Sequence, residues 1–242
     1  MELPKARAVL PQLRFVESID STNLSLQRDY AGLPDLSALA AAEQTAGQGR
    51  AGRDWVSEPG ASISLSVLLR PSRPNISSLI TLLMASSARR AISELYPELE
   101  VSIKWPNDLL IGDRKLAGIL AAVNPDQSVV VGIGINLAKQ SAPETAVALG
   151  EFVSADFDEV LAAVLKKLLD NWQLLQSATP NDWLIEDLRA NCSTLGAEVR
   201  AELVTGESIV GRAKDITADG RLIIESDQEY VLSAADVRHL RR

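Results

Sequence analysis

The sequence predicts an α+β fold, in which a mixed, mainly antiparallel sheet with helices packed on it is followed by a small C-terminal β-barrel. Three observations predict it. Between positions 101 and 137, short apolar segments alternate with tight turns, which is typical of an antiparallel meander and not of strands separated by helices. Two longer amphipathic segments flank this region. After position 192, short strand-like segments follow one another closely.

Two early segments define the first elements. Asp20 or Ser21 can cap a short helix that runs to about Tyr30 and ends before Gly32. Positions 62–67 alternate small polar and apolar residues, and this period of two predicts a half-buried strand.

Two longer segments have the apolar period of helices that pack on a core. The first begins near Asn75, and the second runs from about Ala155 to Gln176. The residues that we expect to face the core are Ile76, Leu79, Ile80, Leu83 and Met84 in the first helix and Phe157, Val160, Leu161, Val164, Leu165, Leu168, Leu169, Trp172 and Leu175 in the second. We expect Trp172, and also Trp183, to be core residues and not parts of a binding site.

The remaining regions have the short period of strands. Between the helices, strands are predicted at 101–103, 109–111, 115–123 and 128–137, with turns at 106–108, 112–114 and 124–126. After Cys192 and Gly196, five short strands in fewer than 50 residues predict a small barrel. We therefore divide the chain into a large domain of residues 1–192 and a small domain of residues 193–242.

The composition argues against several kinds of chemistry. The single histidine, His239, and the single cysteine, Cys192, are too few for a histidine-based triad, a cysteine-rich zinc site or an internal disulfide. The net charge of −8 disfavours nonspecific binding to nucleic acid. Neither a signal peptide nor a long apolar segment is recognisable. We therefore expect a soluble, cytoplasmic protein that binds neither nucleic acid nor membrane, with Cys192 as an inert buried thiol.

Residues 47–55, with the sequence GQGRAGRDW, form a segment rich in glycine and arginine that we call the clamp. Its glycines let the backbone approach a ligand closely. Arg50 and Arg53 supply planar cations for phosphate or carboxylate, and Trp55 supplies a flat face for stacking. The clamp predicts an anionic, aromatic ligand such as a nucleotide. A polar surface loop with chance glycines is the alternative interpretation.

Further motifs accompany the clamp in a fixed order. They are Ser21-Thr22-Asn23, Glu43-Gln44-Thr45-Ala46-Gly47, Lys104-Trp105-Pro106-Asn107-Asp108-Leu109-Leu110, Lys115-Leu116-Ala117-Gly118-Ile119-Leu120 and Val130-Val131-Gly132-Ile133-Gly134-Ile135-Asn136. With the clamp, which follows the pattern Gly-Arg-Gly-Arg-x-Gly-Arg-x-Trp at all but one position, they make the chain resemble the biotin protein ligases. The resemblance implies a class II synthetase-like catalytic domain and an SH3-like C-terminal domain.

The activity that this resemblance implies is an ATP-dependent biotin–protein ligase. Such an enzyme activates biotin as biotinyl-5'-AMP with release of pyrophosphate, and then transfers biotin to a lysine of a biotin carboxyl carrier domain of acetyl-CoA or another acyl-CoA carboxylase. ATP and biotin would be substrates, with Mg²⁺ on the phosphates. Because 20 residues before Ser21 are too few for a helix-turn-helix domain, we expect the monofunctional type without an N-terminal DNA-binding domain.

The resemblance also implies a role for individual residues, with Lys115 and Arg50 as the catalytic pair. The expected biotin-binding residues are Ser21, Thr22, Asn23, Gln44, Gly47, Gln48, Gly49, Arg50, Lys115, Gly118 and Gly132. The expected ATP-binding residues are Arg50, Arg53, Trp55, Lys104, Asn107, Asp108, Lys115 and Asn136. A carboxylate at Asp108 can help to hold Mg²⁺, but the sequence does not define the ligands of a metal.

Local explanations compete with some of these roles. Ser21 can be a helix cap and Lys115 a solvated lysine after a turn. Asn107 and Asp108 can be turn formers. Gly132 and Gly134 can be plain strand glycines, although they also leave room for a ligand against the sheet.

Two other functions compete with the ligase. A lipoate or octanoate transferase would share the catalytic fold but not the clamp pattern. A catalytically silent biotin-sensing regulator would have a DNA-binding segment or would lack Lys115. One departure from the family pattern is Gln48, which stands where arginine is common and so removes one positive charge from the clamp.

Overall fold

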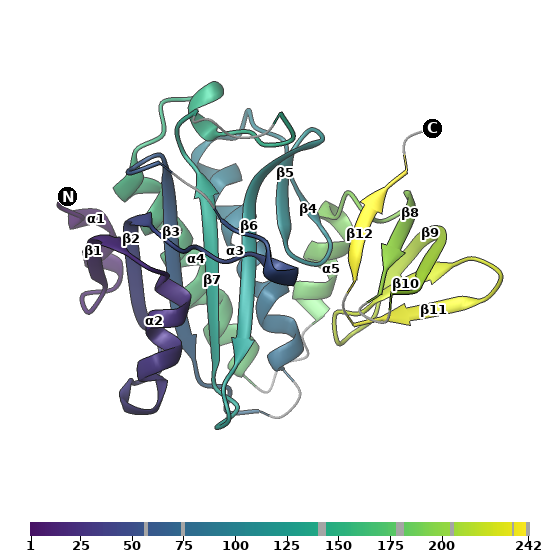
Figure 1. The fold of residues 1–242 in the computed structure, drawn as a ribbon, viewed down its shortest axis with the longest axis horizontal. Coiled ribbons are helices and arrows are strands. Elements are labelled where there is room, and N and C mark those ends of the chain that lie inside the picture. The colour runs from purple at the N-terminus through teal and green to yellow at the C-terminus, as the bar shows by residue number, and fades with distance from the viewer. Residues whose placement is uncertain are drawn as a thin grey trace.

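The computed structural model describes residues 1–55, 58–73, 76–139, 144–177, 182–203, 206–233 and 235–240. These residues form a seven-stranded sheet with the order β1-β2-β3-β7-β6-β5-β4 and a five-stranded sheet with the order β11-β10-β9-β8-β12. In Figure 1 the smaller sheet stands beside the β4 edge of the larger one. We call the described residues between 194 and 240, which contain the smaller sheet, the C-terminal module.

The elements have the following bounds. The large sheet contains β1 (Arg14–Ile19), β2 (Ser37–Gln44), β3 (Ser62–Leu69), β4 (Val101–Lys104), β5 (Asp108–Ile111), β6 (Arg114–Val123) and β7 (Val129–Asn136). The helices are α1 (Pro4–Val9), α2 (Thr22–Asp29), α3 (Ile80–Leu95), α4 (Phe157–Gln176) and α5 (Asp182–Asn191), with 3₁₀ turns η1 (Tyr30–Gly32), η2 (Arg50–Gly52), η3 (Ser77–Leu79) and η4 (Leu149–Glu151). The C-terminal module contains β8 (Glu198–Glu202), β9 (Ser208–Ile216), β10 (Leu222–Glu225), β11 (Glu229–Leu232) and β12 (Asp236–His239).

The large sheet is mixed and mainly antiparallel, which confirms the predicted fold class. β1 and β2 run parallel, with α2 between them in the chain, and the other neighbouring strands pair antiparallel. The predicted meander corresponds to β4 through β7. The C-terminal module is antiparallel throughout, as expected of a small all-β domain.

Two predicted elements differ in detail from the structure. β3 is buried along its whole length, so the expectation of a half-buried strand is wrong. One face of β3 packs into the main core, and its other face lies beneath α2 and the clamp. The predicted start of a helix at Asn75 lies outside the described residues, and α3 begins at Ile80 directly after η3. The segments α1, β1, β2 and α5 were not predicted.

The main core lies between the large sheet and the helices α3 and α4, which cover one face of it (Figure 1). Trp172 of α4 is 3% exposed, and its indole N–H donates to Asp35 Oδ2 at 3.1 Å, as fits a core residue. Trp183 is partly buried against the same core. Among the described residues, no helix combines the length and apolar character needed to cross a bilayer.

The C-terminal module is attached to the large sheet next to β4. The backbone N–H of Trp105 donates to Thr194 Oγ1 and its indole N–H donates to the Gly220 carbonyl, both at 3.0 Å. Nearby, Arg189 of α5 forms an ion pair with Asp215 of β9 at 2.7 Å. Because Trp105 is almost fully buried, these hydrogen bonds have little competition from water and fix the position of the module.

Cys192 lies at the same junction. Its side chain is buried, and burial raises the pKa of its thiol above the ordinary value, in agreement with the expected inert cysteine.

Candidate active site

The floor of the site is a row of small residues on the face of the large sheet that carries α2. In the strand register, Ser66 of β3 lies opposite Gly132 of β7, and Gly134 of β7 lies opposite Gly118 of β6. Because the three glycines have no Cβ atom, the sheet is hollowed at this point. The hollow is a cavity of about 50 Å³ lined by Ser21, Thr22, Asn23, Gln44, Gln48, Gly49, Arg50, Trp55, Leu65, Ser66, Asn107, Lys115, Gly118, Ile119, Leu120, Gly132, Ile133 and Gly134.

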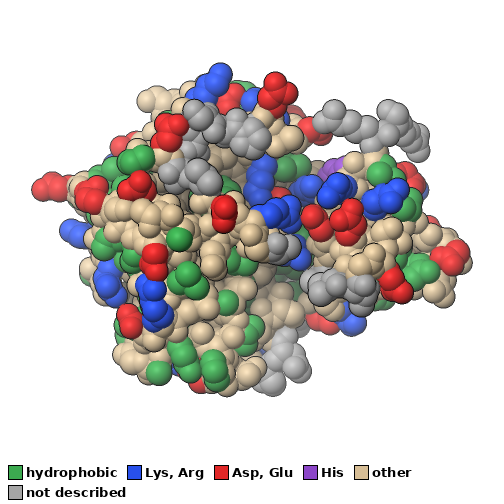
Figure 2. Space-filling model, viewed as in Figure 1, with side chains coloured by type: hydrophobic (Ala, Val, Ile, Leu, Met, Phe, Trp, Pro, Cys, Tyr) green, Lys and Arg blue, Asp and Glu red, His purple; other side chains and the backbone are tan. Residues whose placement is uncertain are grey.

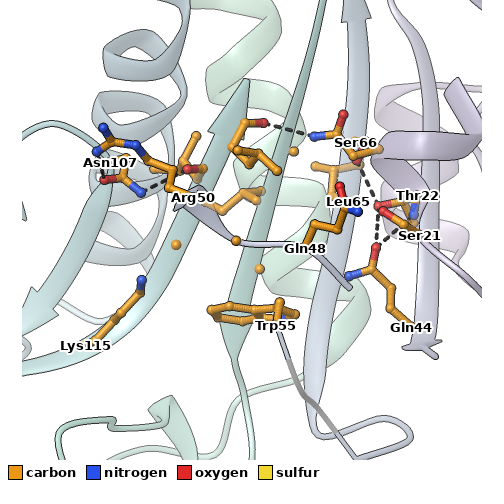
Figure 3. A pocket seen from close by; sticks show the side chains of 18 residues that line it. Ser21, Thr22, Gln44, Gln48, Arg50, Trp55, Leu65, Ser66, Asn107 and Lys115 are labelled. Carbon is orange, nitrogen blue, oxygen red and sulfur yellow. Dashed lines mark hydrogen bonds between the residues drawn. The ribbon is translucent and has the colours of Figure 1, made fainter. Parts of the chain in front are cut away.

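Neutral polar groups gather at one end of this cavity, at the N-terminus of α2 (Figure 3). The Thr22 backbone N–H and hydroxyl both donate to Gln44 Oε1, at 2.8 and 3.1 Å. A hydroxyl has only one proton, which Thr22 gives to Gln44. In the 2.8 Å hydrogen bond between Thr22 Oγ1 and Ser66 Oγ, the Ser66 hydroxyl therefore donates and Thr22 accepts. These bonds fix the amide of Gln44, which leaves its NH₂ group on the side away from Thr22.

Asn23 is held at the same end by two further bonds. Its Nδ2 donates to the Leu120 carbonyl of β6 at 3.0 Å, and its Oδ1 accepts from Gln27 Nε2 at 2.8 Å. A Cβ at Gly132 would lie 2.8 Å from Asn23 Nδ2, so glycine at this position makes room for the amide. This end therefore suits a neutral head with several donors and acceptors.

The clamp closes over the cavity and is held by its own backbone. Trp55 N–H donates to the Gly47 carbonyl at 2.8 Å and Gly49 N–H donates to the Arg53 carbonyl at 2.6 Å. Gly52 has φ +70°, a conformation that favours glycine. In Figure 1 the segment that includes η2 crosses in front of β7 and β6.

Trp55 forms the middle of the cavity wall. Its indole lies against Gly134 so closely that a Cβ there would overlap the ring, and a Cβ at Gly118 would lie 3.3 Å from it. The Lys115 ammonium is 6.0 Å from the ring centroid. Trp55 thus separates the neutral end of the cavity from the cationic end (Figure 3).

Lys115 and Arg50 define the cationic end. Lys115 is the second residue of β6, and its Nζ forms an ion pair with Asp108 Oδ1 of β5 at 2.7 Å. Arg50 Nη1 donates to Asn107 Oδ1 at 3.0 Å and to the Ala235 carbonyl at 3.3 Å. Burial lowers the pKa of Arg50, whereas the nearby carboxylates of Asp236 and Asp108 act in the opposite direction. A partly desolvated cation of this kind favours an anionic ligand.

A second cavity of about 170 Å³ adjoins this end. It is lined by Gly49, Arg50, Arg53, Asp54, Trp55, Lys104, Trp105, Pro106, Asn107, Asp108, Lys115, Ala235, Asp236 and Val237. It therefore lies between the large sheet, the clamp and the C-terminal module. Figure 2 shows Lys and Arg side chains gathered at this junction, with Asp and Glu side chains beside them.

The two cavities bring together most residues predicted from the sequence. Those lining the first cavity are Ser21, Thr22, Asn23, Gln44, Gln48, Gly49, Arg50, Trp55, Asn107, Lys115, Gly118 and Gly132. Arg53, Lys104 and Asp108 line the second. Gly47 lines neither, because it packs against the Trp55 backbone. Asn136 is also outside both, and its buried Nδ2 donates to the Val147 carbonyl at 3.0 Å and to the Lys115 carbonyl at 3.3 Å.

Several lining residues were not predicted. On the sheet they are Leu65, Ser66, Ile119, Leu120 and Ile133, and on the module they are Ala235, Asp236 and Val237. Gly134, which the sequence indicated together with Gly132 as leaving room for a ligand, does line the cavity, as expected for residues two positions apart on one face of a strand. The residues of the module had no such signal.

The site has one carboxylate next to its cations that suits a phosphate-bound metal. Mg²⁺ in nucleotide sites is held by one or two carboxylates together with phosphate and water oxygens. Asp108, beside Lys115, fits this role. Within the described residues, no group of three or more His, Cys, Asp and Glu side chains is arranged to hold a metal ion by itself.

A glycine floor with neutral groups at one end and cations at the other defines a site for a ligand with a polar head and an anionic tail. Residues 15–138 match the Biotin/lipoate A/B protein ligase family, and residues 194–240 match the Biotin protein ligase C terminal domain. The chain belongs to the biotin protein ligases of this family.

Relatives and solved structures agree with this membership. The chain is 36% identical over 241 residues to a biotin–[acetyl-CoA-carboxylase] ligase of Mycobacterium tuberculosis, covering 95% of this chain and 90% of that protein. It is 31% identical to the bifunctional ligase/repressor BirA of Bacillus spizizenii, over 81% of this chain but 63% of that protein. It also resembles the biotin protein ligase of Aquifex aeolicus in complex with biotin and ATP, with 27% identity, a TM-score of 0.83, and coverage of 95% of this chain and 99% of that one.

Proposed function

We propose that the two cavities activate biotin with ATP and then pass it to a lysine of a carrier domain. The reaction is that of the biotin protein ligases: a biotin carboxylate oxygen attacks the α-phosphorus of ATP, and pyrophosphate leaves. The amine of the acceptor lysine then attacks the acyl carbon, loses a proton and displaces AMP. The observation that carries this proposal is that one cavity is lined by Thr22 at its neutral end and by Lys115 and Arg50 at its cationic end, and that these two cations also line the second cavity.

The first cavity suits biotin because its two ends match the two ends of that molecule. The ureido head is neutral and needs fixed donors and acceptors, which Ser21, Thr22, Asn23 and Gln44 supply. The glycine floor allows the fused rings to lie against the sheet once the Trp55 indole, which lies against Gly134 in this structure, moves away from it. The biotin carboxylate would then lie toward Lys115 and Arg50.

The cations do the chemical work of adenylation. Two anions must approach each other, and negative charge grows on the oxygens around the α-phosphorus in the transition state. Lys115 is held by β6 and by the ion pair with Asp108, and Arg50 is held by Asn107, so both are preorganised to stabilise this charge. Arg53 and Lys104 line the second cavity and would bind the phosphates. Asn136 would act indirectly, by bracing the strand that carries Lys115.

Mg²⁺ would be held by the ATP phosphates and the Asp108 carboxylate, and would neutralise part of the phosphate charge. The acceptor we propose is the biotin carboxyl carrier domain of an acyl-CoA carboxylase, and the compartment we propose is the cytoplasm. The repressor function in the name of the Bacillus relative is a property of that protein.

Biotin-dependent exchange of labelled pyrophosphate into ATP tests the first half-reaction without the acceptor. We expect exchange with biotin and none with lipoate or without an added acid. Labelled biotin with ATP and a purified carrier domain then tests transfer, and a carrier with its acceptor lysine replaced by arginine is the control. Exchange with lipoate but not with biotin would contradict the proposed substrate.

A further inference from the structure

The C-terminal module contacts both arginines of the clamp at the start of β12. Asp236 Oδ2 lies 3.3 Å from Arg53 Nη2 in an ion pair, and the carbonyl of the preceding residue, Ala235, accepts from Arg50 Nη1. The two arginines and the start of β12 line the same cavity. One short segment of the module thus reaches both cations that, under the proposed function, would face the phosphates of ATP.

This segment is a firm support for the clamp. β12 pairs with β8 along its length, with Asp236 opposite Glu202. The module is in turn tied to the large sheet through the hydrogen bonds of Trp105 to Thr194 and Gly220. Asp236 is therefore presented from a paired strand of an anchored domain.

The clamp needs such a support when no ligand is present. Arg50 and Arg53 are like charges in one short loop, and the phosphates that would neutralise them are absent before ATP binds. The carboxylate of Asp236 lies near both guanidinium groups and can compensate their charge. Without it, repulsion between the arginines would favour an open and variable clamp.

We propose that Asp236 is a positioning residue that holds Arg53, and with it the clamp, in the closed arrangement before ATP binds. The expected effect of Asp236 on catalysis rests on the proposed function, whereas its expected effect on the clamp does not. Asp236 makes no step of the reaction. Because Asp236 already orders the clamp, less conformational entropy is lost when ATP binds. We therefore expect Asp236 to lower the KM for ATP and to leave kcat nearly unchanged.

The first test is hydrogen exchange of residues 47–55 in the ligand-free protein. Asp236→Asn keeps the size of the side chain and removes its charge, and we expect exchange in the clamp to rise about two- to fivefold, the scale of an exposed ion pair. Asp236→Glu should restore most of the protection. Glu202→Gln is the matched control. Glu202 lies opposite Asp236 in the sheet, but its carboxylate pairs with Arg238 and not with the clamp, so its loss should leave exchange in the clamp unchanged.

A double variant shows whether Asp236 acts through Arg53. Exchange in Asp236→Asn/Arg53→Ala should be no faster than in Arg53→Ala alone, whereas additive effects would overturn the proposal. Equal exchange in Asp236→Asn and the wild type would also overturn it. Cooperative thermal unfolding of each variant near the wild-type temperature shows that the module still folds.

The second test is the KM for ATP in pyrophosphate exchange. We expect Asp236→Asn to raise it about two- to fivefold, and more at low than at high salt, because salt screens an exposed pair. A lower KM would show that Asp236 competes with phosphate instead of positioning the clamp, and would overturn the proposal. If the wild type itself shows no biotin-dependent exchange, the proposed function fails, and hydrogen exchange still decides the role of Asp236.

Discussion

The floor of the pocket and the clamp above it are built from opposite kinds of interaction. The floor consists of paired strands, and the polar groups beside it are bonded to one another: the buried Thr22 of α2 bonds to Gln44 and to the buried Ser66. The clamp is a short loop with exposed charges, held by a few backbone bonds and by contacts with the module. The floor can therefore recognise the neutral part of a ligand by shape, whereas the clamp responds to charge.

This difference also indicates which region moves. The cavity beneath the clamp measures about 50 Å³, whereas ligand pockets are typically about 300–1,000 Å³. Moving β3, β6 or β7 would break strand pairing, but moving the clamp breaks few bonds. We infer that the clamp opens to admit biotin and closes again over it, which excludes water from the reactive adenylate.

The largest effect should come from a cation at the far end of the floor. Replacing Lys115 with alanine removes a preorganised charge from the transition state, and we expect the adenylation rate to fall by about 10²–10³. Pyrophosphate exchange at saturating biotin and ATP measures it. Lys166→Ala, on the exposed side of α4, is the control and should leave the rate unchanged. Near wild-type pyrophosphate exchange in Lys115→Ala would mean that the charge of Lys115 takes no part in adenylation.

A change in the floor should come next. A Cβ at position 132 would lie 2.8 Å from Asn23 Nδ2 and 2.9 Å from Ser66 Oγ, two side chains with fixed partners. Overpacking of this kind costs about 1–3 kcal/mol, so Gly132→Ala should raise the Kd for biotin about 10- to 100-fold. Isothermal titration with biotin provides a direct measurement.

Gly118→Ala gives the matched comparison on the same floor. A Cβ there would lie 3.0 Å from the flexible end of Lys115, which can move aside. We expect this variant to lower the rate of exchange more than the affinity for biotin. An equal loss of biotin affinity in both variants would contradict the division of the floor into a neutral and a cationic end.

The two arginines of the clamp should contribute differently to the retention of biotinyl-5'-AMP. Arg50 is half-buried and bonded to Asn107, so Arg50→Ala should shorten the lifetime of bound biotinyl-5'-AMP about tenfold. Arg53 is exposed, so Arg53→Ala should shorten this lifetime only severalfold. Release of labelled adenylate into a trap measures both lifetimes.

Closure of the clamp over bound ligands is a separate prediction. Hydrogen exchange of residues 47–55 should slow in the wild type when biotin and ATP bind, and equal protection with and without ligand would argue against closure.

The sequence was informative where the chemistry is local. Ser21 to Asn23, the clamp and the residues around Lys115 could be predicted because each motif carries its groups within a few positions. β2 could not, because Ser37–Gln44 is rich in alanine and has neither the period nor the composition of a strand. It becomes a strand because β1 and β3 pair with it on both sides.

The contacts between the C-terminal module and the clamp could not be predicted from the sequence either. Ala235 is 185 positions from Arg50, so no local pattern relates the two. A contact of this separation depends on how the domains dock, which in turn depends on Trp105 entering the junction. The sequence marked Trp105 as part of a motif but did not indicate its partner.

The smallest expected effect distinguishes the two explanations of Ser21. Its Oγ accepts from Leu24 N–H at 3.4 Å, which is long for a hydrogen bond, so the cap contributes little to α2. Ser21→Ala should therefore lower the free energy of unfolding by no more than about 0.5 kcal/mol, the low end for a lost cap. If the hydroxyl serves biotin instead, its affinity should fall about two- to tenfold, the value of one hydrogen bond. Urea unfolding and biotin titration of Ser21→Ala separate the outcomes, and a loss of stability with unchanged biotin affinity would make Ser21 a helix cap alone.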